Sequence, residues 1–453
     1  MNFIIQENKI ITDCFVFPND ITKYRPFKYN HIILIDDGIL VTNMLTGGLI
    51  HLDNYEASQY EQNKYVDKNL FKELCEKKFL VPETIDDYQI SKQIIDVAKL
   101  MYSQIKPTAQ YTIMTTTDCN ARCFYCYEKD MKRIVMSEKM AKDVAKFIIK
   151  NSEGKNVQIS WFGGEPLYNS EVIDIISSTL KEKNIRFSSR MISNAYLFDD
   201  NIVEKAKSIW HLKKVQITLD GTEKIYNKAK NYIYENCESP FLRVIRNIHL
   251  LLSKNIFVSV RLNMDSYNSN DLHKLADFLN KEFSQNEKLS MEVYVTLLYD
   301  YSIARPLEAK KKLLANFYSI SNKLKDYSLY NAKNFSNILK QHSCMADNNN
   351  ALLINPDGML GKCEHFGDSD FYGNIYDGII ESNVKDWSIH KMPIEKCSDC
   401  IHYPRCIKLK KCPNAIADCD DVDIAIKTYH LENSILKMYN NFKTLQRNNK
   451  YEI

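Results

Sequence analysis

Hydrophobic and polar residues alternate with two different periods through the middle of the chain. Short runs rich in β-branched and aromatic residues have strand character, and each is followed by a longer run in which apolar residues recur every three or four positions. The strand-like runs cover residues 111–115, 157–161, 187–193, 215–219, 257–263 and 291–296. The helix-like runs cover residues 138–150, 171–183, 200–210, 241–253 and 271–280. In the first of these helices Ala141, Val144 and Ile148 share an apolar face, and Ser137 is placed as the N-cap. Strands that alternate with helices predict an α/β fold with a parallel sheet over residues 106–300.

The flanking parts of the chain have other patterns. Residues 1–105 contain three strand-like runs, 31–35, 39–42 and 49–52, which precede two helix-like stretches at 55–61 and 66–79. Strands followed by helices predict a small winged-helix-like module. Residues 301–343 are predicted to be a bridging segment with a helix over 307–326. Residues 344–453 are predicted to form a cysteine-rich domain that ends in a helix.

Composition limits the classes of function. A chain of 453 residues is expected to form two or three domains. Its 60 basic and 57 acidic residues nearly balance, which gives no electrostatic footprint for nucleic acid or an anionic membrane. The start of the chain lacks a signal-peptide pattern, and no apolar run approaches the roughly 20 residues of a membrane helix. We therefore expect a cytoplasmic protein, in which thirteen cysteines favour metal or redox chemistry over disulfides.

Three of these cysteines are closely spaced directly after the first strand of the predicted sheet. Cys119, Cys123 and Cys126 are separated by three and then two residues, a spacing that lets thiolates converge on one soft metal centre. Three thiolates leave one iron of a 4Fe–4S cluster without a protein ligand. The alternative is a structural zinc ion, but such a site takes four ligands, and no His or fourth Cys follows nearby.

This motif, with the aromatic Tyr125 just before its last cysteine, resembles that of the radical S-adenosylmethionine (radical SAM) enzymes. The resemblance implies a partial (β/α)₆ barrel whose site lies beyond the carboxyl ends of the strands. It also implies that the open iron of a 4Fe–4S cluster chelates S-adenosylmethionine. One electron from the cluster then cleaves this cofactor to methionine and a 5′-deoxyadenosyl radical, which abstracts hydrogen from a substrate.

Other landmarks of that family stand at the ends of the next two strands. The segment after the second strand resembles the family's Gly-Gly-Glu-Pro turn, which hydrogen-bonds the methionyl amine of the cofactor; its residues are Gly163, Gly164, Glu165 and Pro166. Glycine allows close backbone approach, and a carboxylate accepts from an ammonium group. Ser193 and Asn194, after the third strand, match positions that contact the ribose, although they would equally suit a cap for the next helix.

The fourth and fifth strands carry further candidates. Asp220 ends the fourth strand in a Leu-Asp-Gly landmark, where it either binds substrate or shapes the turn. Family members often continue with His and Arg, whereas Lys230 and its neighbours stand here. Arg261 and Asn263 in the fifth strand resemble the group that pairs with the cofactor carboxylate. A charged residue inside a barrel is costly without a partner, which favours a functional role for Arg261.

Seven cysteines in the last third of the chain resemble the SPASM extension of radical SAM enzymes, which holds two auxiliary 4Fe–4S clusters. The family pattern implies one cluster on Cys397, Cys400, Cys406 and Cys419, and a second, with an open iron, on Cys344, Cys363 and Cys412. The turn 355–358 is predicted to fold the first two of these cysteines toward each other. The spacing around Cys412 and Cys419 departs from the family pattern, and a zinc ribbon on the clustered cysteines is the alternative.

Glu364 and His365 directly follow Cys363. In sulfatase-maturating relatives an Asp at the position of Glu364 takes a substrate proton, and Glu364 is therefore a candidate catalytic base. Both side chains could equally orient the cluster ligands.

The resemblance implies a peptide maturase that forms a thioether or carbon–carbon cross-link in a ribosomally made precursor. Its partners would be the leader of that precursor, bound by residues 1–105 through strand addition, and an electron donor such as flavodoxin or ferredoxin. Residues 1–105 would otherwise be a structural cap. The rival functions are formylglycine formation on a sulfatase and peptide binding by a non-catalytic iron–sulfur or zinc protein.

Overall fold

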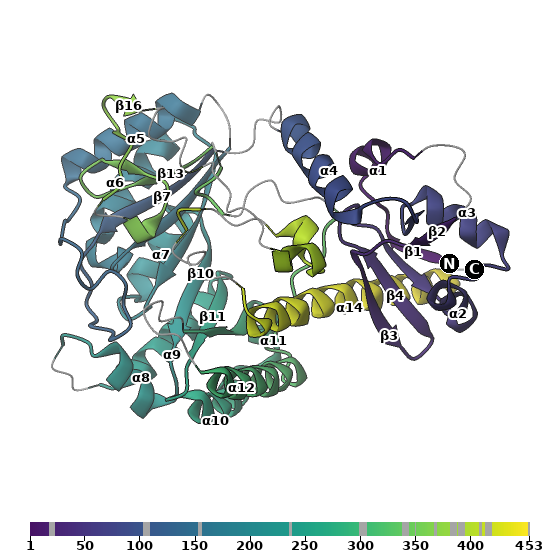
Figure 1. Ribbon diagram of the computed structural model, residues 1–453. Helices are drawn as coiled ribbons and strands as arrows, with labels where there is room; N and C mark the ends of the chain where they lie inside the picture. Colours follow the sequence, from purple (N-terminus) through teal and green to yellow (C-terminus); the bar gives the residue numbers. More distant parts are fainter. Residues whose placement is uncertain are drawn as a thin grey trace.

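The computed structural model contains a large α/β unit and a smaller N-terminal unit, which the last helix of the chain connects (Figure 1). It describes residues 1–17, 23–102, 109–152, 156–234, 238–298, 306–337, 344–348, 350–366, 369–380, 387, 395–406, 410–412 and 419–451. Cys237, which the sequence indicates to be a plain thiol, lies outside the described residues.

The α/β unit is built on an eight-stranded sheet of order β12-β11-β10-β9-β8-β7-β13-β14. Six parallel strands follow one another in sequence order: β7 (Ala109–Thr116), β8 (Val157–Gly163), β9 (Phe187–Ser193), β10 (Leu212–Leu219), β11 (Phe257–Met264) and β12 (Met291–Leu297). The connecting helices are α5 (Glu138–Ser152), α6 (Ser170–Glu182), α7 (Asp200–Ser208), α9 (Pro240–Ser253) and α10 (Ser269–Glu282). The predicted parallel α/β fold is therefore confirmed, as is the cap of α5, where Ser137 Oγ accepts from Met140 N at 3.2 Å.

Two strands at the edge of this sheet come from the cysteine-rich region. β13 (Ala351–Ile354) pairs in parallel with β7, and β14 (Leu360–Gly361) pairs with β13 in the antiparallel sense. The predicted turn at 355–358 joins them, since Gly358 N donates to Asn355 O at 2.9 Å and Gly358 has φ +84°. This pairing fixes the cysteine-rich region beside the first strand of the barrel.

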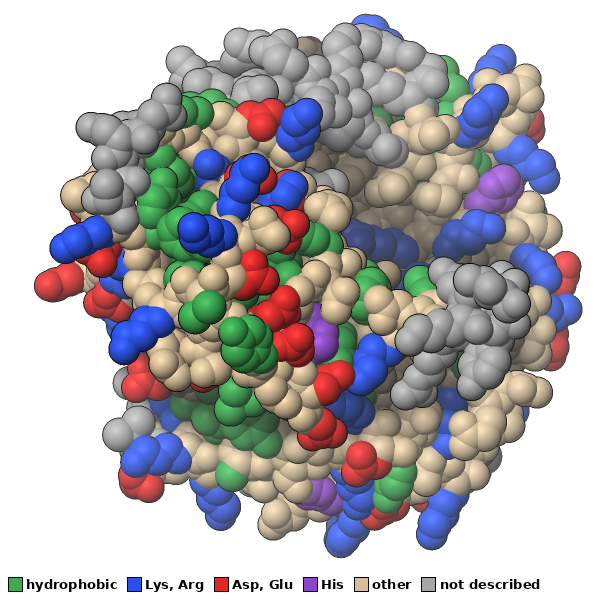
Figure 2. Space-filling model, turned by 90° about the vertical axis from the view of Figure 1, so that its right-hand side faces the viewer, with side chains coloured by type: hydrophobic (Ala, Val, Ile, Leu, Met, Phe, Trp, Pro, Cys, Tyr) green, Lys and Arg blue, Asp and Glu red, His purple; other side chains and the backbone are tan. Residues whose placement is uncertain are grey.

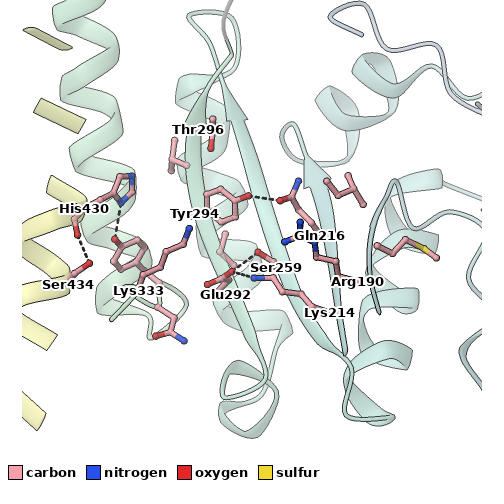
Figure 3. Close-up of a pocket in the computed structure, with 16 residues that line it drawn as sticks. Arg190, Lys214, Gln216, Ser259, Glu292, Tyr294, Thr296, Lys333, His430 and Ser434 are labelled. Atoms are coloured by element: carbon pink, nitrogen blue, oxygen red, sulfur yellow. Dashed lines mark hydrogen bonds and ion pairs between the residues drawn. The ribbon is translucent and has the colours of Figure 1, made fainter. Parts of the chain in front are cut away.

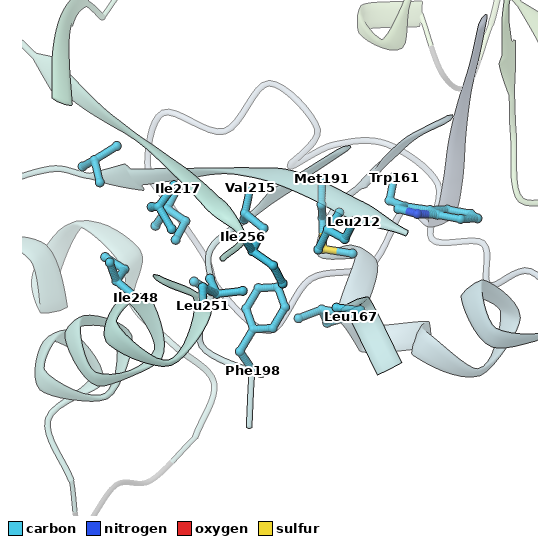
Figure 4. Packing of buried hydrophobic residues seen from close by; sticks show 14 of the residues in the cluster. Trp161, Leu167, Met191, Phe198, Leu212, Val215, Ile217, Ile248, Leu251 and Ile256 are labelled. Atoms are coloured by element: carbon cyan, nitrogen blue, oxygen red, sulfur yellow. The ribbon is translucent and has the colours of Figure 1, made fainter. Parts of the chain in front are cut away.

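The core lies between the sheet and its helices. Trp161, Val215 and Ile217 from the strands pack with Ile248 and Leu251 of α9, and each of them is at most 1% exposed (Figure 4). Burying a large apolar side chain stabilises the fold by about 1.5–3 kcal/mol. Successive strand residues face opposite sides of a sheet, so the other side carries the intervening residues. We call that side the inner face; it includes Ser160, Arg190, Gln216, Ser259 and Glu292.

The N-terminal unit is a four-stranded antiparallel sheet of order β1-β5-β4-β3, with helices on both faces. Its strands are β1 (Asn2–Ile5), β3 (Asn30–Ile35), β4 (Gly38–Asn43) and β5 (Leu49–Leu52). Ile39, Val41 and Leu52 pack against α2 (Asn54–Gln62) and α3 (Lys68–Glu76). On the opposite face Leu40 and Leu49 pack against the last helix, α14 (Asp421–Tyr451). Figure 1 shows this helix running up to the N-terminal sheet. The predicted strands and helices of this unit are present.

Several elements were not predicted. In the N-terminal unit these are β1, α1 (Lys9–Cys14), α4 (Asp87–Tyr102) and the pair β2 (Tyr24–Pro26) and β6 (Leu80–Pro82). In the α/β unit they are α8 (Glu223–Lys230), α11 (Gln285–Lys288) and the edge strands described above. The bridging helix α12 has the predicted bounds, Leu307–Asp326. A short hairpin of β15 (Gly373–Asn374) and β16 (Gly378–Ile379) follows β14.

The surface carries charges of both signs. Over the face shown in Figure 2, Lys and Arg side chains are interspersed with Asp and Glu side chains, as the nearly balanced composition leads one to expect. Among the described helices, none combines the length and the apolar character that crossing a bilayer requires.

Candidate active site at the carboxyl ends of the strands

The cysteine loop, residues 117–134, leaves the end of β7 and returns to the same point. Thr117 N donates to Ile134 O at 2.9 Å, and Thr117 Oγ1 donates to Lys132 O at 2.7 Å. At the start of the loop, Asp118 Oδ1 lies 3.8 Å from an Arg122 nitrogen and 3.5 Å from Arg133 Nε. These contacts close the loop at its base and hold its cysteines above the sheet.

The three cysteines of this loop are partly buried and have few polar neighbours. Ala121 N lies 3.4 Å and Asn194 Nδ2 lies 3.8 Å from Cys119 Sγ, and Cys123 Sγ lies 4.0 Å from the carbonyl of Lys230. Burial raises the pKa of Cys119 to about 12 and that of Cys126 to about 11. Without a metal both are therefore neutral thiols, and metal binding must displace their protons. In the described chain, no three His, Cys, Asp or Glu side chains are grouped to hold a single metal ion.

The two glycines at the end of β8, Gly163 within the strand and Gly164 after it, lie against the backbone around the start of the cysteine loop. A Cβ on Gly163, which has φ +121°, would lie 2.0 Å from Thr116 O, and a Cβ on Gly164 would lie 2.3 Å from Asp118 O. Gly164 N and Glu165 N donate to these same two carbonyls, at 3.1 and 3.0 Å. The glycines thus allow the end of β8 to lie directly against the start of the cysteine loop. This structural role was not predicted from the sequence. Pro166 then begins a single 3₁₀ turn, Pro166–Asn169.

Glu165 joins the ends of β8 and β9 from a fully buried position. Its carboxylate accepts from Ser193 Oγ at 2.8 Å, from Asn194 N at 2.7 Å and from Leu167 N at 3.2 Å. Burial raises the pKa of Glu165 to about 7, although these hydrogen bonds lower it. The predicted contact with the cofactor amine remains a prediction, whereas the structure shows a carboxylate that positions two strand ends.

Ser193 and Asn194 serve the turn after β9 and not the next helix. Asn194 Nδ2 donates to Asn120 Oδ1 at 2.7 Å, which ties this turn to the cysteine loop. The cap of α7 is Asp199, which accepts from Ile202 N at 2.7 Å. The helix-cap alternative for Ser193 and Asn194 is therefore wrong, and the ribose contact remains a prediction.

A buried network joins the cysteine loop to the fourth strand. Tyr125 OH donates to Asp220 Oδ2 at 2.9 Å, and Lys230 Nζ lies 3.2 Å from Asp220 Oδ2 and 3.0 Å from Tyr125 OH. Asp220 is 0% and Lys230 4% exposed. Burial opposes the charge on Lys230, but Asp220 together with Tyr125, Cys123 and Tyr226 outweighs it, and the pKa of Lys230 stands well above its usual value. In the sequence, Lys230 stands out only as a departure from the family pattern.

Several polar atoms near these strand ends are buried without a hydrogen-bond partner in the described chain. They are Asn120 Nδ2, Asp220 Oδ1, Arg261 Nε and Asn263 Oδ1. Arg261 and Asn263 are two residues apart in β11, and Arg261 is paired with Tyr294 across the β11–β12 ladder. Buried polar groups are rarely left unpaired in native proteins. Donors and acceptors of this kind fit a polar, charged ligand such as S-adenosylmethionine.

The structure brings some of the seven C-terminal cysteines near one another. Cys344 and Cys412 lie close enough to Cys363 to affect its ionisation, and Cys363 and Cys412 both pack against Ala346 and Trp387. Cys397 and Cys400 lie in and after the 3₁₀ turn Glu395–Asp399, with Cys400 N donating to Cys397 O at 3.2 Å. Cys406 and Cys419 share a neighbour, since Lys427 Nζ lies 4.0 Å from the first sulfur and 3.6 Å from the second. Ligation by these two groups remains a prediction.

The two cysteine regions meet through side chains that adjoin their cysteines. Tyr127, next to Cys126, packs against His365, two residues after Cys363, with ring centroids 4.1 Å apart and the rings tilted by 33°. Glu128 is buried beside Glu364, and burial together with that second carboxylate raises the pKa of Glu128 to about 8. Glu364 therefore lies at the junction between the cysteine loop and the C-terminal region.

The N-terminal unit contacts the segment that carries Cys397, Cys400 and Cys406. Tyr29 OH donates to Ser398 O at 2.8 Å, between Cys397 and Cys400 in sequence, and Arg405 Nε donates to Met44 O at 2.7 Å. Tyr29 also packs on Tyr403, with ring centroids 5.7 Å apart. These contacts place the N-terminal unit beside the C-terminal cysteines. Binding of a peptide by this unit remains a prediction.

Comparisons with known proteins agree with this architecture. Residues 113–279 match the family model described as the radical SAM superfamily. The chain is 23% identical over 432 residues to the radical SAM cyclopropyl synthase TigE of Paramaledivibacter caminithermalis, and the match covers 84% of each chain. Among solved structures, it is similar to native anSMEcpe with bound AdoMet (TM-score 0.55, 14% identity, 73% of this chain and 98% of that chain). It is also similar to Streptococcus suis SuiB bound to precursor peptide SuiA (TM-score 0.50, 16% identity, 88% and 99%).

Proposed function

Because residues 113–279 form a radical SAM domain and the protein is a radical SAM enzyme, we propose that it is a maturase of a ribosomally made precursor peptide. The proposed reaction removes hydrogen from a C–H bond of the peptide and forms a thioether or carbon–carbon cross-link. Two similar solved proteins bind peptides: SuiB is bound to precursor peptide SuiA, and anSMEcpe to the Cp18Cys peptide.

The contact between the two cysteine regions is the observation that carries this proposal. Tyr127 and His365 bring the C-terminal cysteines against the cysteine loop at the carboxyl ends of the strands. Forming a cross-link removes two hydrogen atoms from the peptide, one as an atom and the other as a proton and an electron. An auxiliary cluster on the C-terminal cysteines would accept that electron, and the Glu364 side chain at the same junction would accept the proton.

The residues of this chain have distinct proposed roles. Cys119, Cys123 and Cys126 hold a 4Fe–4S cluster, and the strand-end polar groups, Asn194, Arg261 and Asn263 among them, hold S-adenosylmethionine. When bound, this pair supplies the 5′-deoxyadenosyl radical. Glu165 positions the strand ends around it, and Lys230 pairs with Asp220 and holds Tyr125 beside the last cysteine. Two auxiliary clusters are proposed on the C-terminal cysteines, with an electron donor such as flavodoxin or ferredoxin.

The N-terminal unit is proposed to bind the leader of the precursor. Helices pack on both faces of its sheet, but β3 ends the sheet, and no other described strand pairs with its outer edge. Ile32 and Leu34 on this strand are 40% and 76% exposed. An extended peptide adds to such an edge by main-chain hydrogen bonds, and exposed apolar side chains add affinity.

The primary test is anaerobic reconstitution with iron, sulfide and S-adenosylmethionine, followed by reduction with dithionite. The proposed function predicts 5′-deoxyadenosine and, when the enzyme is coexpressed with a short open reading frame encoded beside its gene, a peptide lighter by the mass of two hydrogen atoms per cross-link. Conversion of a sulfatase cysteine to formylglycine would instead support the alternative function. A protein that makes no 5′-deoxyadenosine would be a non-catalytic binding protein.

The metal content gives a second test. The triple variant C119A/C123A/C126A is expected to lose about four irons per chain and all 5′-deoxyadenosine formation, because each cluster of this type holds four irons. The seven C-terminal cysteines are expected to retain about eight irons and no stoichiometric zinc. Elemental analysis that finds one zinc and a single cluster per chain would contradict the auxiliary clusters and support the zinc ribbon.

A further inference from the structure

The inner face of the sheet borders a cavity to which no residue of the cysteine loop contributes. Its volume is about 650 Å³, within the range typical of ligand sites. Strands β9, β10, β11 and β12 form one wall, and residues 330–333 after α12 and part of α14 form the other (Figure 3). Lys214 and Glu292 stand in the first halves of β10 and β12, so this part of the cavity lies away from the strand ends that carry the cysteine loop.

Three basic side chains and one carboxylate line this cavity: Arg190, Lys214, Lys333 and Glu292. The carboxylate is already engaged, because Glu292 Oε1 accepts from Lys214 Nζ at 2.7 Å and from Ser259 Oγ at 2.6 Å (Figure 3). Arg190 has a long contact to a neutral group, with its Nε 3.4 Å from Ser160 Oγ. Within the described chain, neither Arg190 nor Lys333 forms an ion pair with a carboxylate. The cavity thus has an excess of positive charge.

Four of the remaining polar side chains of the cavity are neutral and form two pairs. Tyr294 OH donates to Gln216 Oε1 at 3.0 Å, and Tyr330 OH lies 3.1 Å from His430 Nδ1 (Figure 3). Burial lowers the pKa of His430, and the nearby charge of Lys333 lowers it further, so the ring is neutral at pH 7. None of these groups compensates the charges of Arg190 and Lys333.

We propose that this cavity binds a carboxylate of the substrate peptide, that of an Asp or Glu side chain. The inference rests on the proposed function and adds the class of residue that the enzyme selects. The guanidinium of Arg190 has the fork geometry that pairs with a carboxylate through two hydrogen bonds, and Lys333 adds a point charge from the facing wall. Arg190 and Lys333 are thus specificity-determining residues, at a distance from the reacting atoms.

The test measures binding, which does not depend on chemistry. Equilibrium dialysis of the reconstituted enzyme is run with N-acetylated, C-amidated Gly-Ser octapeptides that carry either Glu or Gln at the central position. A third octapeptide carries Gln and a free C-terminal carboxylate. The inference predicts that the Glu peptide binds at least about fivefold more tightly than the other two, a modest discrimination of about 1 kcal/mol. Tighter binding of the third peptide alone would assign the cavity to a chain terminus and overturn the side-chain proposal.

Variants locate the binding. Arg190→Gln and Lys333→Gln should each bring the Glu peptide to the affinity of the Gln peptide, and Arg190→Glu should favour a Lys peptide. Lys213→Gln is the matched control, because Lys213 is an exposed neighbour of Lys214 that does not line the cavity. Arg190 and Lys333 are both exposed, and if Arg190→Gln does not fold, Lys333→Gln, outside the sheet, still decides the question.

The outcomes separate this inference from the function on which it rests. Equal binding of the Glu and Gln peptides, or a preference that survives both single variants, overturns the cavity proposal even if the enzyme makes 5′-deoxyadenosine and cross-links its precursor. Absence of 5′-deoxyadenosine overturns the proposed function, while a cavity-dependent preference for Glu would remain a property of the binding site.

Discussion

At the scale of single residues, Lys230 stabilises the candidate site by pairing with the buried side chain of Asp220. Its ammonium group is the only cation within ion-pair distance of Asp220 in the described chain. Removing one partner of a buried ion pair leaves an uncompensated charge and typically costs about 3–5 kcal/mol. Lys230→Met should therefore lower the free energy of unfolding by about that amount, measured by denaturation of the α/β unit.

Two further variants control this prediction. Lys228→Met removes an exposed lysine of the same helix, α8, and should change stability by less than about 0.5 kcal/mol. The double variant K230M/D220N removes both charges and should recover part of the loss. If Lys230→Met is as stable as Lys228→Met, the ion pair does not hold the site together.

Glu165 makes stability depend on pH. Its pKa of about 7 in the folded protein lies above the usual value for a glutamate, so the folded state holds a proton that the unfolded chain releases. This contribution to stability is fully present below the unfolded pKa and is lost as pH rises through the folded pKa. The slope is about −1.4 kcal/mol per pH unit between about pH 4.5 and 7. Glu165→Gln should remove that slope, which thermal unfolding from pH 5 to 7.5 would reveal. An unchanged slope would mean that Glu165 does not cause it, and that its carboxylate lies in a more polar environment that leaves its pKa near the usual value.

The sequence identified the chemistry of these residues better than their contacts. Cysteine spacing and the Gly-Gly-Glu-Pro turn are local patterns, so their positions at the strand ends could be predicted. The hydrogen bonds of Glu165 to Ser193 and of Tyr125 to Asp220 join residues 28 and 95 positions apart, and no local pattern encodes such pairs. The period-two alternation of polar residues in β10 to β12 was the available signal for the cavity on the inner face.

At the scale of elements, the end of β8 limits where the cysteine loop can lie. Gly163→Ala places a Cβ against Thr116 O and forces the loop away from β8. We expect this variant to lose most of the roughly four irons of the loop cluster and its 5′-deoxyadenosine formation, with the other iron retained. Iron analysis and electron paramagnetic resonance of the reduced protein measure both.

The hairpin that follows β14 offers a matched control for that substitution. Gly378 also has a positive φ, +86°, but a Cβ there would meet nothing within 4 Å. Gly378→Ala therefore carries the same kind of backbone strain without the contact, and it should retain the iron of the loop cluster. Equal iron loss in both variants would attribute the effect to strain alone.

The sequence predicts those helices and strands whose own residues carry a long periodic pattern. The six parallel strands and their helices have long periodic patterns, and their predicted positions agree with the structure. β13 has only four residues and becomes a strand because β7 provides a partner for it. β1 and the β2–β6 pair are similarly short and depend on distant partners, which local patterns do not reveal.

At the scale of the whole molecule, α14 connects the N-terminal unit to the rest of the chain. The helix has 31 residues, about 46 Å at 1.5 Å per residue. Lys427 near its start contacts two cysteines, and Ile435 and Tyr439 further along pack on β4 and β5. Described residues of the N-terminal unit consequently share a core with the C-terminal helix. Deleting them would expose that core, so point substitutions on β3 give a cleaner test of leader binding.

The last prediction concerns the free edge of the N-terminal sheet. The double substitution Ile32→Glu and Leu34→Glu replaces two exposed apolar side chains of β3 with negatively charged ones. They stand on the strand where the leader is proposed to pair. Cross-linking of the full-length precursor should fall at least tenfold, because the core peptide alone would then provide recognition. Abortive formation of 5′-deoxyadenosine without peptide should be unchanged, since both positions are remote from the cysteine loop. Val66→Glu is the control, because Val66 is 78% exposed in the same unit and lies outside the sheet. If the β3 double variant processes precursor as well as the Val66 variant does, the N-terminal unit is a structural cap and the leader binds elsewhere.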